Sequence, residues 1–98
     1  MEKLVKLEVL SLSGNEISLI ENISLLVELK VLRLSSNKIE KIENIDSLVL
    51  LEAINLKNNQ IKVFEGIGNN SQLQEIFLST YIFIEVAILL TKSLKTRQ

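Results

Sequence analysis

Apolar and polar positions along this chain follow a pattern that repeats every 22 residues. Four segments, beginning at residues 7, 29, 51 and 73, each read apolar-x-x-apolar-x-apolar, as in Leu-Glu-Val-Leu-Ser-Leu at residues 7–12. Three residues after the last apolar position of the first three segments comes an asparagine, and apolar residues then recur at about every third position. Self-similarity at a fixed step of roughly 20–50 residues indicates a repeat architecture.

The spacing of the apolar residues excludes an amphipathic helix. A step of three residues drifts by about 60° around an α-helix, so the apolar stripe between Ile39 and Leu51 would wind most of the way round it. A coiled coil needs alternating steps of three and four, which are missing. We therefore predict short strands over residues 9–12, 31–34, 53–56 and 75–78, each followed by a tight, 3₁₀-like return. Strands of successive repeats would stack in parallel as a solenoid.

The repeated asparagines stand where each strand turns away from the sheet. A side-chain amide there can donate to and accept from backbone groups that no sheet ladder pairs. Stacked repeats would place Asn15, Asn37 and Asn59 in a buried ladder. The alternative is three unrelated turn asparagines, which identical placement at a 22-residue step disfavours.

The composition narrows the possible chemistry. A chain of 98 residues is at most one domain, and 47% hydrophobic residues with only 4% aromatics is too aliphatic for a disordered segment. Histidine and cysteine are both absent, which excludes a disulfide framework, a zinc site and a histidine-based catalytic triad. We expect no metal and no cofactor.

The charge pattern gives no sign of a nucleic-acid, membrane or catalytic role. The net charge is -1 and no basic block is present, so no nucleic-acid partner is expected. The longest apolar run, residues 82–90, contains Glu85 and is too short to span a bilayer. The remaining paired carboxylates, such as Glu21 and Glu43, are expected on an exposed face. We therefore expect no enzyme and no small-molecule substrate.

One short motif carries a family resemblance. Ile-Glu-Asn-Ile occurs at residues 20–23 and 42–45, and more loosely as Phe-Glu-Gly-Ile at 64–67. This sequence resembles the 22-residue class of leucine-rich repeats typified by the regulatory subunit of protein phosphatase 1, and residues 37–48 are especially close to it. The axonemal dynein light chain and the spliceosomal A-prime protein have similar repeats. The resemblance, which covers residue 4 to about residue 78, implies an α/β leucine-rich-repeat solenoid of about four turns. Its parallel strands would form the concave face and its irregular returns the convex face.

The two ends depart from the pattern. We expect leucine-rich repeats over residues 1–80 and an atypical C-terminal cap or tail over 81–98, because Tyr81 stands where asparagine is expected. Leu4 takes the place of Leu26 and Leu48, so the chain begins inside a repeat without a polar cap. The stretch Gly-Ile-Gly-Asn-Asn at residues 66–70 lacks the third glycine and the following helix of a phosphate loop and predicts a wider turn. The chain could be a fragment, a truncated relative or half of an oligomer.

The resemblance implies that a protein partner binds the outward strand positions of the concave face. Arg33 and Phe77 are residue types enriched in binding hot spots. Phe77 could instead pack under the C-terminal segment, and Val9 and Val31 could reflect strand preference alone. Three columns result: Val9, Val31, Ala53 and Glu75; Ser11, Arg33, Asn55 and Phe77; Ser13, Ser35, Lys57 and Ser79.

The favoured function is a non-catalytic interaction module, an adaptor resembling the phosphatase regulator and located in the cytoplasm or nucleus. Its candidate partner is a phosphatase catalytic subunit. One alternative is a structural subunit like the axonemal dynein light chain, bound to a motor heavy chain in the axoneme. Another is a self-associating fragment, for example a homodimer formed through exposed apolar ends.

Overall fold

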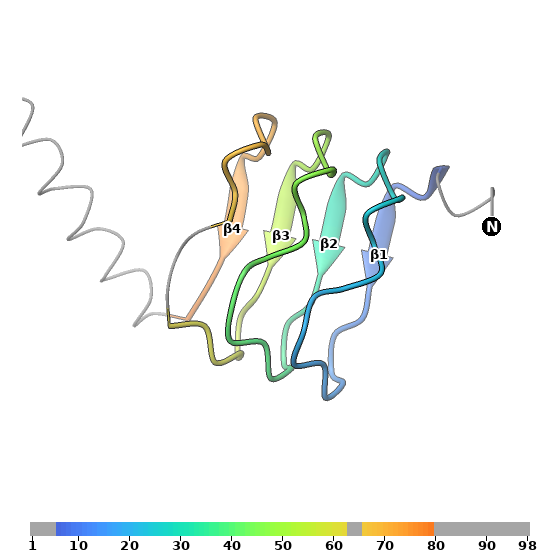
Figure 1. Ribbon diagram of the computed structural model, residues 1–98. Helices are drawn as coiled ribbons and strands as arrows, with labels where there is room; N and C mark the ends of the chain where they lie inside the picture. Colours follow the sequence, from blue (N-terminus) through green and yellow to red (C-terminus); the bar gives the residue numbers. More distant parts are fainter. Residues whose placement is uncertain (1–5, 63–65, 80–98) are drawn as a thin grey trace, which may run out of the picture.

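Four short strands stack side by side in one parallel sheet (Figure 1). The computed structural model describes residues 6–62 and 66–79. The strands lie in chain order and are β1 (Val9–Ser11), β2 (Val31–Arg33), β3 (Ala53–Asn55) and β4 (Glu75–Phe77). The leucine-rich-repeat solenoid expected from the sequence is confirmed. Each strand begins at the predicted residue and ends one residue early, although Leu12 N still donates a hydrogen bond to Arg33 O over 2.8 Å.

Residues that pair across neighbouring strands are 22 residues apart in the sequence, which is the length of the repeat. Leu10 pairs with Leu32, Leu32 with Ile54, and Ile54 with Ile76, each one 22-residue step further on. Because side chains alternate across a strand, this register puts all four of these residues on the inner side of the sheet. A slip of one residue would move each of them to solvent, so the apolar pattern fixes the stacking.

The core is most complete in the two middle coils. In the second coil (residues 29–50) every inward apolar position is buried, and in the third coil (residues 51–72) Ile67 is half-buried while Leu51, Ile54, Leu56 and Ile61 are buried. The equivalent Leu7, Leu10 and Ile17 of the first coil (residues 7–28) are only half-buried. The solenoid thus buries its core by stacking coil on coil, and a coil with one neighbour buries less. The most deeply buried side chains are Leu29, Leu32, Ile39, Ile42, Ile45, Leu48, Leu51, Ile54 and Leu56.

The returns repeat the same tight turn. In each of the three, a backbone N–H donates to the carbonyl three residues earlier, as in a single 3₁₀-type turn. The stretch at residues 66–70 therefore forms the same turn as its predecessors, and the prediction of a wider turn there is wrong. The bonds join Leu26 N to Ile23 O, Leu48 N to Ile45 O and Asn70 N to Ile67 O, at 3.0, 3.1 and 3.2 Å.

Six residues with positive φ form two columns at the 22-residue step, and the apolar pattern does not predict either column. Non-glycine residues rarely adopt positive φ, and asparagine tolerates it better than most. The signal in the sequence is a column of glycine, asparagine or serine at the 22-residue step, which includes the asparagine of Ile-Glu-Asn-Ile. The columns are Gly14, Ser36 and Asn58, and Asn22, Asn44 and Gly66.

Gly66→Ala is expected to lower the free energy of unfolding by about 2 kcal/mol, because a left-handed backbone is unfavourable for alanine and the site is crowded. Gly66 has a φ of 82°, and a Cβ there would approach Ile42 O more closely than real Cβ atoms do. Gly14→Ala is the matched control, since Gly14 has a φ of 75° with open space around it. Its cost should be about 1 kcal/mol from φ alone. Urea denaturation measures both, and equal losses would contradict the close approach to the second coil.

Asn70 interrupts an apolar column. It stands in the place of Leu26 and Leu48, and it is buried. Its Nδ2 donates to Ile45 O and Leu48 O over 3.0 and 2.9 Å, whereas its Oδ1 has no hydrogen-bond partner in the part of the chain that the structure describes. The Asn70 amide thus hydrogen-bonds the third return to the second. Its buried Oδ1 is left unpaired, which lowers stability.

Candidate protein-binding face

The exposed face of the sheet, called the concave face from here on, is built from the strand residues between the inward leucines and isoleucines. Members of each of the first two predicted columns pair directly with one another across neighbouring strands, so each column forms a row across the four strands. The first row is Val9, Val31, Ala53 and Glu75, and the second row is Ser11, Arg33, Asn55 and Phe77.

Exposure differs along these rows. Val9, Ser11, Arg33, Glu75 and Phe77 are exposed. The remaining members lie on the two middle strands and are half-buried because they have neighbours on both sides; they are Val31, Ala53 and Asn55. The outer strands therefore present more side-chain surface than the middle of the sheet.

Three neighbouring repeats place a cationic and aromatic cluster at one end of the strands. Its members are Arg33 at the end of β2, Lys57 in the turn after β3, and Phe77 at the end of β4. The ammonium of Lys57 lies 5.5 Å from the centroid of the Phe77 ring, within the range of a cation–π interaction. Asn55, between Arg33 and Phe77 in the second row, accepts a hydrogen bond from Lys57 N through Oδ1 over 3.1 Å. The ring of Phe77 is still 38% exposed, so a partner can contact it. The alternative that Phe77 lies under the C-terminal segment involves residues 80–98, which are outside the described part of the chain.

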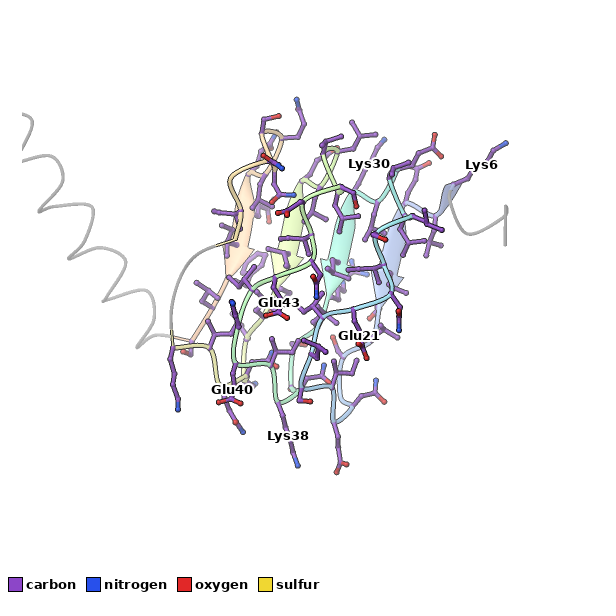
Figure 2. All side chains as sticks on the ribbon, viewed as in Figure 1. Lys6, Glu21, Lys30, Lys38, Glu40 and Glu43 are labelled. Carbon is purple, nitrogen blue, oxygen red and sulfur yellow. The ribbon has the colours of Figure 1, made fainter. Side chains whose placement is uncertain are left out.

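Acidic side chains lie at the other end of the strands. Glu8 pairs with Lys30 across β1 and β2, with 3.3 Å between Oε1 and Nζ, and both side chains are well exposed (Lys30 is labelled in Figure 2). Glu52 and Glu75 are exposed at the starts of β3 and β4. Lys30 balances Glu8, so the excess negative charge at the beginning of the strands comes from Glu52 and Glu75, whereas Arg33 and Lys57 are cationic at the opposite end.

Two serines of the third predicted column hydrogen-bond to each other. Ser35 Oγ donates a hydrogen bond to Ser13 Oγ over 2.9 Å, one repeat away. Ser79, at the far end of the column, is half-buried. Lys57, between them, is thus the residue of this column that offers charge to a partner.

The asparagine ladder connects neighbouring coils. Asn37 is buried; its Nδ2 donates to Leu34 O within its own coil and to Leu12 O of the preceding coil, over 3.0 and 3.1 Å. Its Oδ1 accepts a hydrogen bond from Ile17 N over 3.0 Å. Asn59 repeats this arrangement one coil further on, with Nδ2 donating to Leu34 O and Oδ1 accepting from Ile39 N.

The prediction that all three ladder asparagines are buried is wrong for Asn15. This residue is exposed, and its Nδ2 donates only within its own coil, to Leu12 O and more weakly to Ser13 O. Asn59 is half-buried rather than fully buried. The reason for Asn15 is positional, because no described coil precedes the first one to supply carbonyls or to cover the amide.

Residues 6–62 and 66–79 lack the features that a metal site or a membrane-spanning helix requires. Within these ranges, no three histidine, cysteine, aspartate or glutamate side chains gather closely enough to hold a metal ion. No helix in the same ranges has the length and apolar character needed to cross a membrane. Glu21 and Glu43 lie on successive returns, away from the sheet (Figure 2).

Comparison with known families agrees with this geometry. Residues 5–48 match the family model described as leucine rich repeats, with two copies. The matched residues are the first two coils. The third and fourth coils continue the same strand register beyond them. No curated protein sequence matches the chain. Leucine-rich repeats generally mediate protein–protein interaction and are typically non-catalytic.

Proposed function

We propose that this chain is a non-catalytic adaptor that binds a protein partner through its concave face. The observation that supports the proposal is that Arg33 at the end of β2, Lys57 in the turn after β3 and Phe77 at the end of β4 lie on neighbouring repeats, with Lys57 over the Phe77 ring. Arginine and aromatic side chains contribute most to the binding energy of protein interfaces. A rigid sheet presents them with little loss of conformational entropy on binding, because the strands are already ordered.

The chemistry of the cluster defines the partner surface. Two cations beside an exposed ring suit a segment that carries carboxylates next to an apolar side chain. The acidic starts of β3 and β4 disfavour carboxylates at the opposite end of the strands, so the partner should be acidic on one side only. We propose a phosphatase catalytic subunit as the partner, in line with the resemblance of the repeats to the phosphatase regulator. A motor heavy chain is the competing candidate.

The proposed partners imply different locations. Regulation of a phosphatase would place the chain in the cytoplasm or nucleus. A role as a structural motor subunit would place it in the axoneme.

Phe77→Ala and Arg33→Ala are each expected to weaken partner binding by at least about thirtyfold, which corresponds to about 2 kcal/mol and is typical of hot-spot residues. Titration calorimetry with purified phosphatase catalytic subunit, and separately with purified motor heavy chain, measures the affinities. Matched controls are Leu25→Ala, an apolar residue 72% exposed on a return, and Lys38→Ala, an exposed cation on a return (Figure 2).

The controls separate the faces of the solenoid. Loss of binding in Leu25→Ala or Lys38→Ala, with normal binding by the concave variants, would reject the concave face. Binding to the motor heavy chain alone would reject the phosphatase assignment and leave the adaptor role in place. No binding to either protein would reject both candidate partners.

A further inference from the structure

Arg33 and Lys57 are two exposed cations of the concave face that no described carboxylate neutralises. In the part of the chain that the structure describes, the ion pairs use other cations, Lys30 and Lys41. Both Arg33 and Lys57 belong to the middle repeats, with the described strands β1 and β4 on either side. Two unpaired cations on one face of a rigid sheet can bind the same anion, provided that they are close enough.

The sheet register places Asn55 between these two cations. Arg33 and Asn55 pair directly across β2 and β3, about 5 Å apart. Lys57 follows two positions after Asn55, about 7 Å further along the chain. The ladder continues past the strands, because Leu34 N donates to Asn55 O and Ser36 N donates to Lys57 O, both over 2.8 Å. The backbones of Arg33 and Lys57 are therefore about 8 Å apart, which two long side chains can bridge.

Both cationic side chains lie on the concave side of the sheet. Arg33 is exposed between Leu32 and Leu34, which are buried and point inward, so alternation along the strand directs Arg33 outward. The ammonium of Lys57 lies over the ring of Phe77, which is exposed on the same face. The two positive charges therefore flank Asn55 from opposite sides.

Uncharged donors complete the site. Asn55 Oδ1 accepts a hydrogen bond from Lys57 N over 3.1 Å, which leaves Nδ2 as a donor with no acceptor among the described residues. Ser35, beside Lys57 in the next row, donates its hydroxyl to Ser13 over 2.9 Å. The two rows that contain Arg33 and Lys57 hold no acidic residue. The site thus offers positive charge and donors without a competing carboxylate.

This combination matches a phosphoryl group better than a carboxylate. A phosphorylated side chain carries about −1.5 to −2 charges at neutral pH and three acceptor oxygens, so one group can meet two cations and an amide at once. A carboxylate carries one negative charge and two oxygens, which leaves part of the positive charge uncompensated.

We propose that the concave face binds a phosphorylated serine or threonine of the partner, with the phosphoryl group over Asn55 and between Arg33 and Lys57. The inference rests on the proposed binding of a protein partner through this face, and it specifies a modification that the partner must carry. Partner binding would then depend on a kinase that phosphorylates that segment.

The three side chains have different roles at the phosphoryl group. The planar guanidinium of Arg33 can donate two parallel hydrogen bonds to two of its oxygens. The ammonium of Lys57 acts as a point charge, and the amide of Asn55 donates to a remaining oxygen. Phe77 provides apolar surface beside the site, so an apolar residue next to the phosphorylated one gains a contact.

The acidic starts of the strands restrict the ligand to an isolated phosphorylated residue. Glu52 and Glu75 are exposed at the opposite end of the concave face and form no ion pair with a described residue. A nucleic-acid backbone or an anionic membrane surface spreads negative charge beyond one site and would meet these carboxylates. A single phosphoryl group on a protein segment avoids them.

Three peptides that differ in one side chain test the inference on the full chain. Each has about eight residues, no other charge and one leucine beside the central position, which is phosphoserine, glutamate or serine. Fluorescence anisotropy should show the phosphoserine peptide binding at least tenfold more tightly than the glutamate peptide, and no measurable binding of the serine peptide. Affinity for the phosphoserine peptide should fall with rising salt, and also as the pH falls through about 6, where the phosphoryl group loses its second charge.

Variants of the full chain locate the site. Arg33→Gln and Lys57→Gln should each weaken binding of the phosphoserine peptide at least tenfold, and Arg33→Lys should restore only part of it, because lysine lacks the paired donors. Lys38→Gln, on a return, and Lys30→Gln, at the acidic end of the concave face, remove the same charge and should bind as wild type does (Figure 2). Circular dichroism establishes that every variant is folded.

Nuclear magnetic resonance of the full chain gives a readout that does not depend on substitution. The phosphoserine peptide should shift the side-chain amide signal of Asn55, which lies at the site. It should leave the signal of Asn22 unchanged, because Asn22 is exposed on a return. A shift of Asn22 without a shift of Asn55 would overturn the placement of the site.

Other outcomes would also overturn the proposal. They are equal affinity for the phosphoserine and glutamate peptides, no binding of the phosphoserine peptide, and a loss in Lys38→Gln as large as that in Arg33→Gln. Equally tight binding of a single-stranded oligonucleotide, or of phosphatidylcholine vesicles that contain a phosphatidylinositol bisphosphate, would assign the site to a different ligand.

Calorimetry with the candidate partner proteins judges the adaptor role separately. Binding of a partner protein without binding of the phosphoserine peptide would reject this inference and leave the adaptor role in place. Binding of the phosphoserine peptide without binding of either protein would reject the two candidate partners and support the phosphoryl site.

Discussion

Replacing Leu32 by alanine should lower the free energy of unfolding by about 4 kcal/mol, because the truncation leaves a cavity that the neighbouring coils cannot close. Leu32 is fully buried in β2, between Leu10 of β1 and Ile54 of β3. The parallel ladders on both sides hold the backbone at fixed strand spacing, so collapse around the missing side chain is limited. Chemical denaturation of wild type and variant measures the loss.

Leu10→Ala is the matched control for this prediction. Leu10 occupies the same column one coil earlier, but it is only half-buried and has one neighbouring strand. Its truncation should cost about 1–2 kcal/mol, since less contact is lost and solvent already reaches the site. An equal loss in the two variants would contradict the lower burial of Leu10 in the first coil.

Asn37→Ala is expected to cost about 3 kcal/mol, because the backbone N–H of Ile17 loses its partner and the carbonyls of Leu12 and Leu34 each lose one hydrogen bond. Ile17 N donates to no other acceptor among the hydrogen bonds of the described residues, and the carbonyl of Leu12 keeps only the amide of Asn15. The side chain thus pairs backbone atoms in two coils that the sheet does not reach. Removing it should loosen the contact between the first and second coils.

Asn15→Ala isolates the contribution of these bonds between coils. The Asn15 amide bonds only within its own coil and is exposed, so its loss should cost no more than about 0.5–1 kcal/mol. Thermal and urea denaturation of Asn15→Ala, Asn37→Ala and Asn59→Ala provide the series. A loss in Asn15→Ala as large as that in Asn37→Ala would mean that bonds to the preceding coil add nothing.

The strands and their register could be predicted because every coil packs apolar side chains into the core at the same positions. Leu10, Leu32, Ile54 and Ile76 must all point inward, so the 22-residue spacing in the sequence is also the spacing between neighbours in the sheet. The rows of the concave face follow from the same spacing, since outward positions are defined by the inward ones. Periodicity therefore locates Arg33 and Phe77 without any structure.

Other features depend on neighbours that the pattern does not contain. Asn15 matches Asn37 in the sequence, yet it differs in burial because coverage comes from the adjacent coil. The contact between Lys57, in the turn after β3, and Phe77 of β4 depends on side-chain orientations that the repeat pattern does not determine. The two columns of residues with positive φ contain glycine, asparagine and serine, so the pattern of apolar residues does not reveal them.

The exposed columns vary from coil to coil because packing does not constrain their side chains. Inward positions recur because each coil needs them to pack, whereas outward positions are free to differ from coil to coil. Arg33 therefore stands beside Ser11 and Asn55 in one row. Information about the partner resides in these differences, and information about the fold resides in the repetition.

The stacking of each coil on the next has a consequence for how the chain reaches its native state. Every strand pairs only with strands one 22-residue step away, so each contact closes a short loop whatever the total chain length. The entropy lost on closing such a loop grows only slowly with its size and is the same at each step. Folding can thus start in the middle of the chain, where two coils already bury each other, and spread outward one coil at a time.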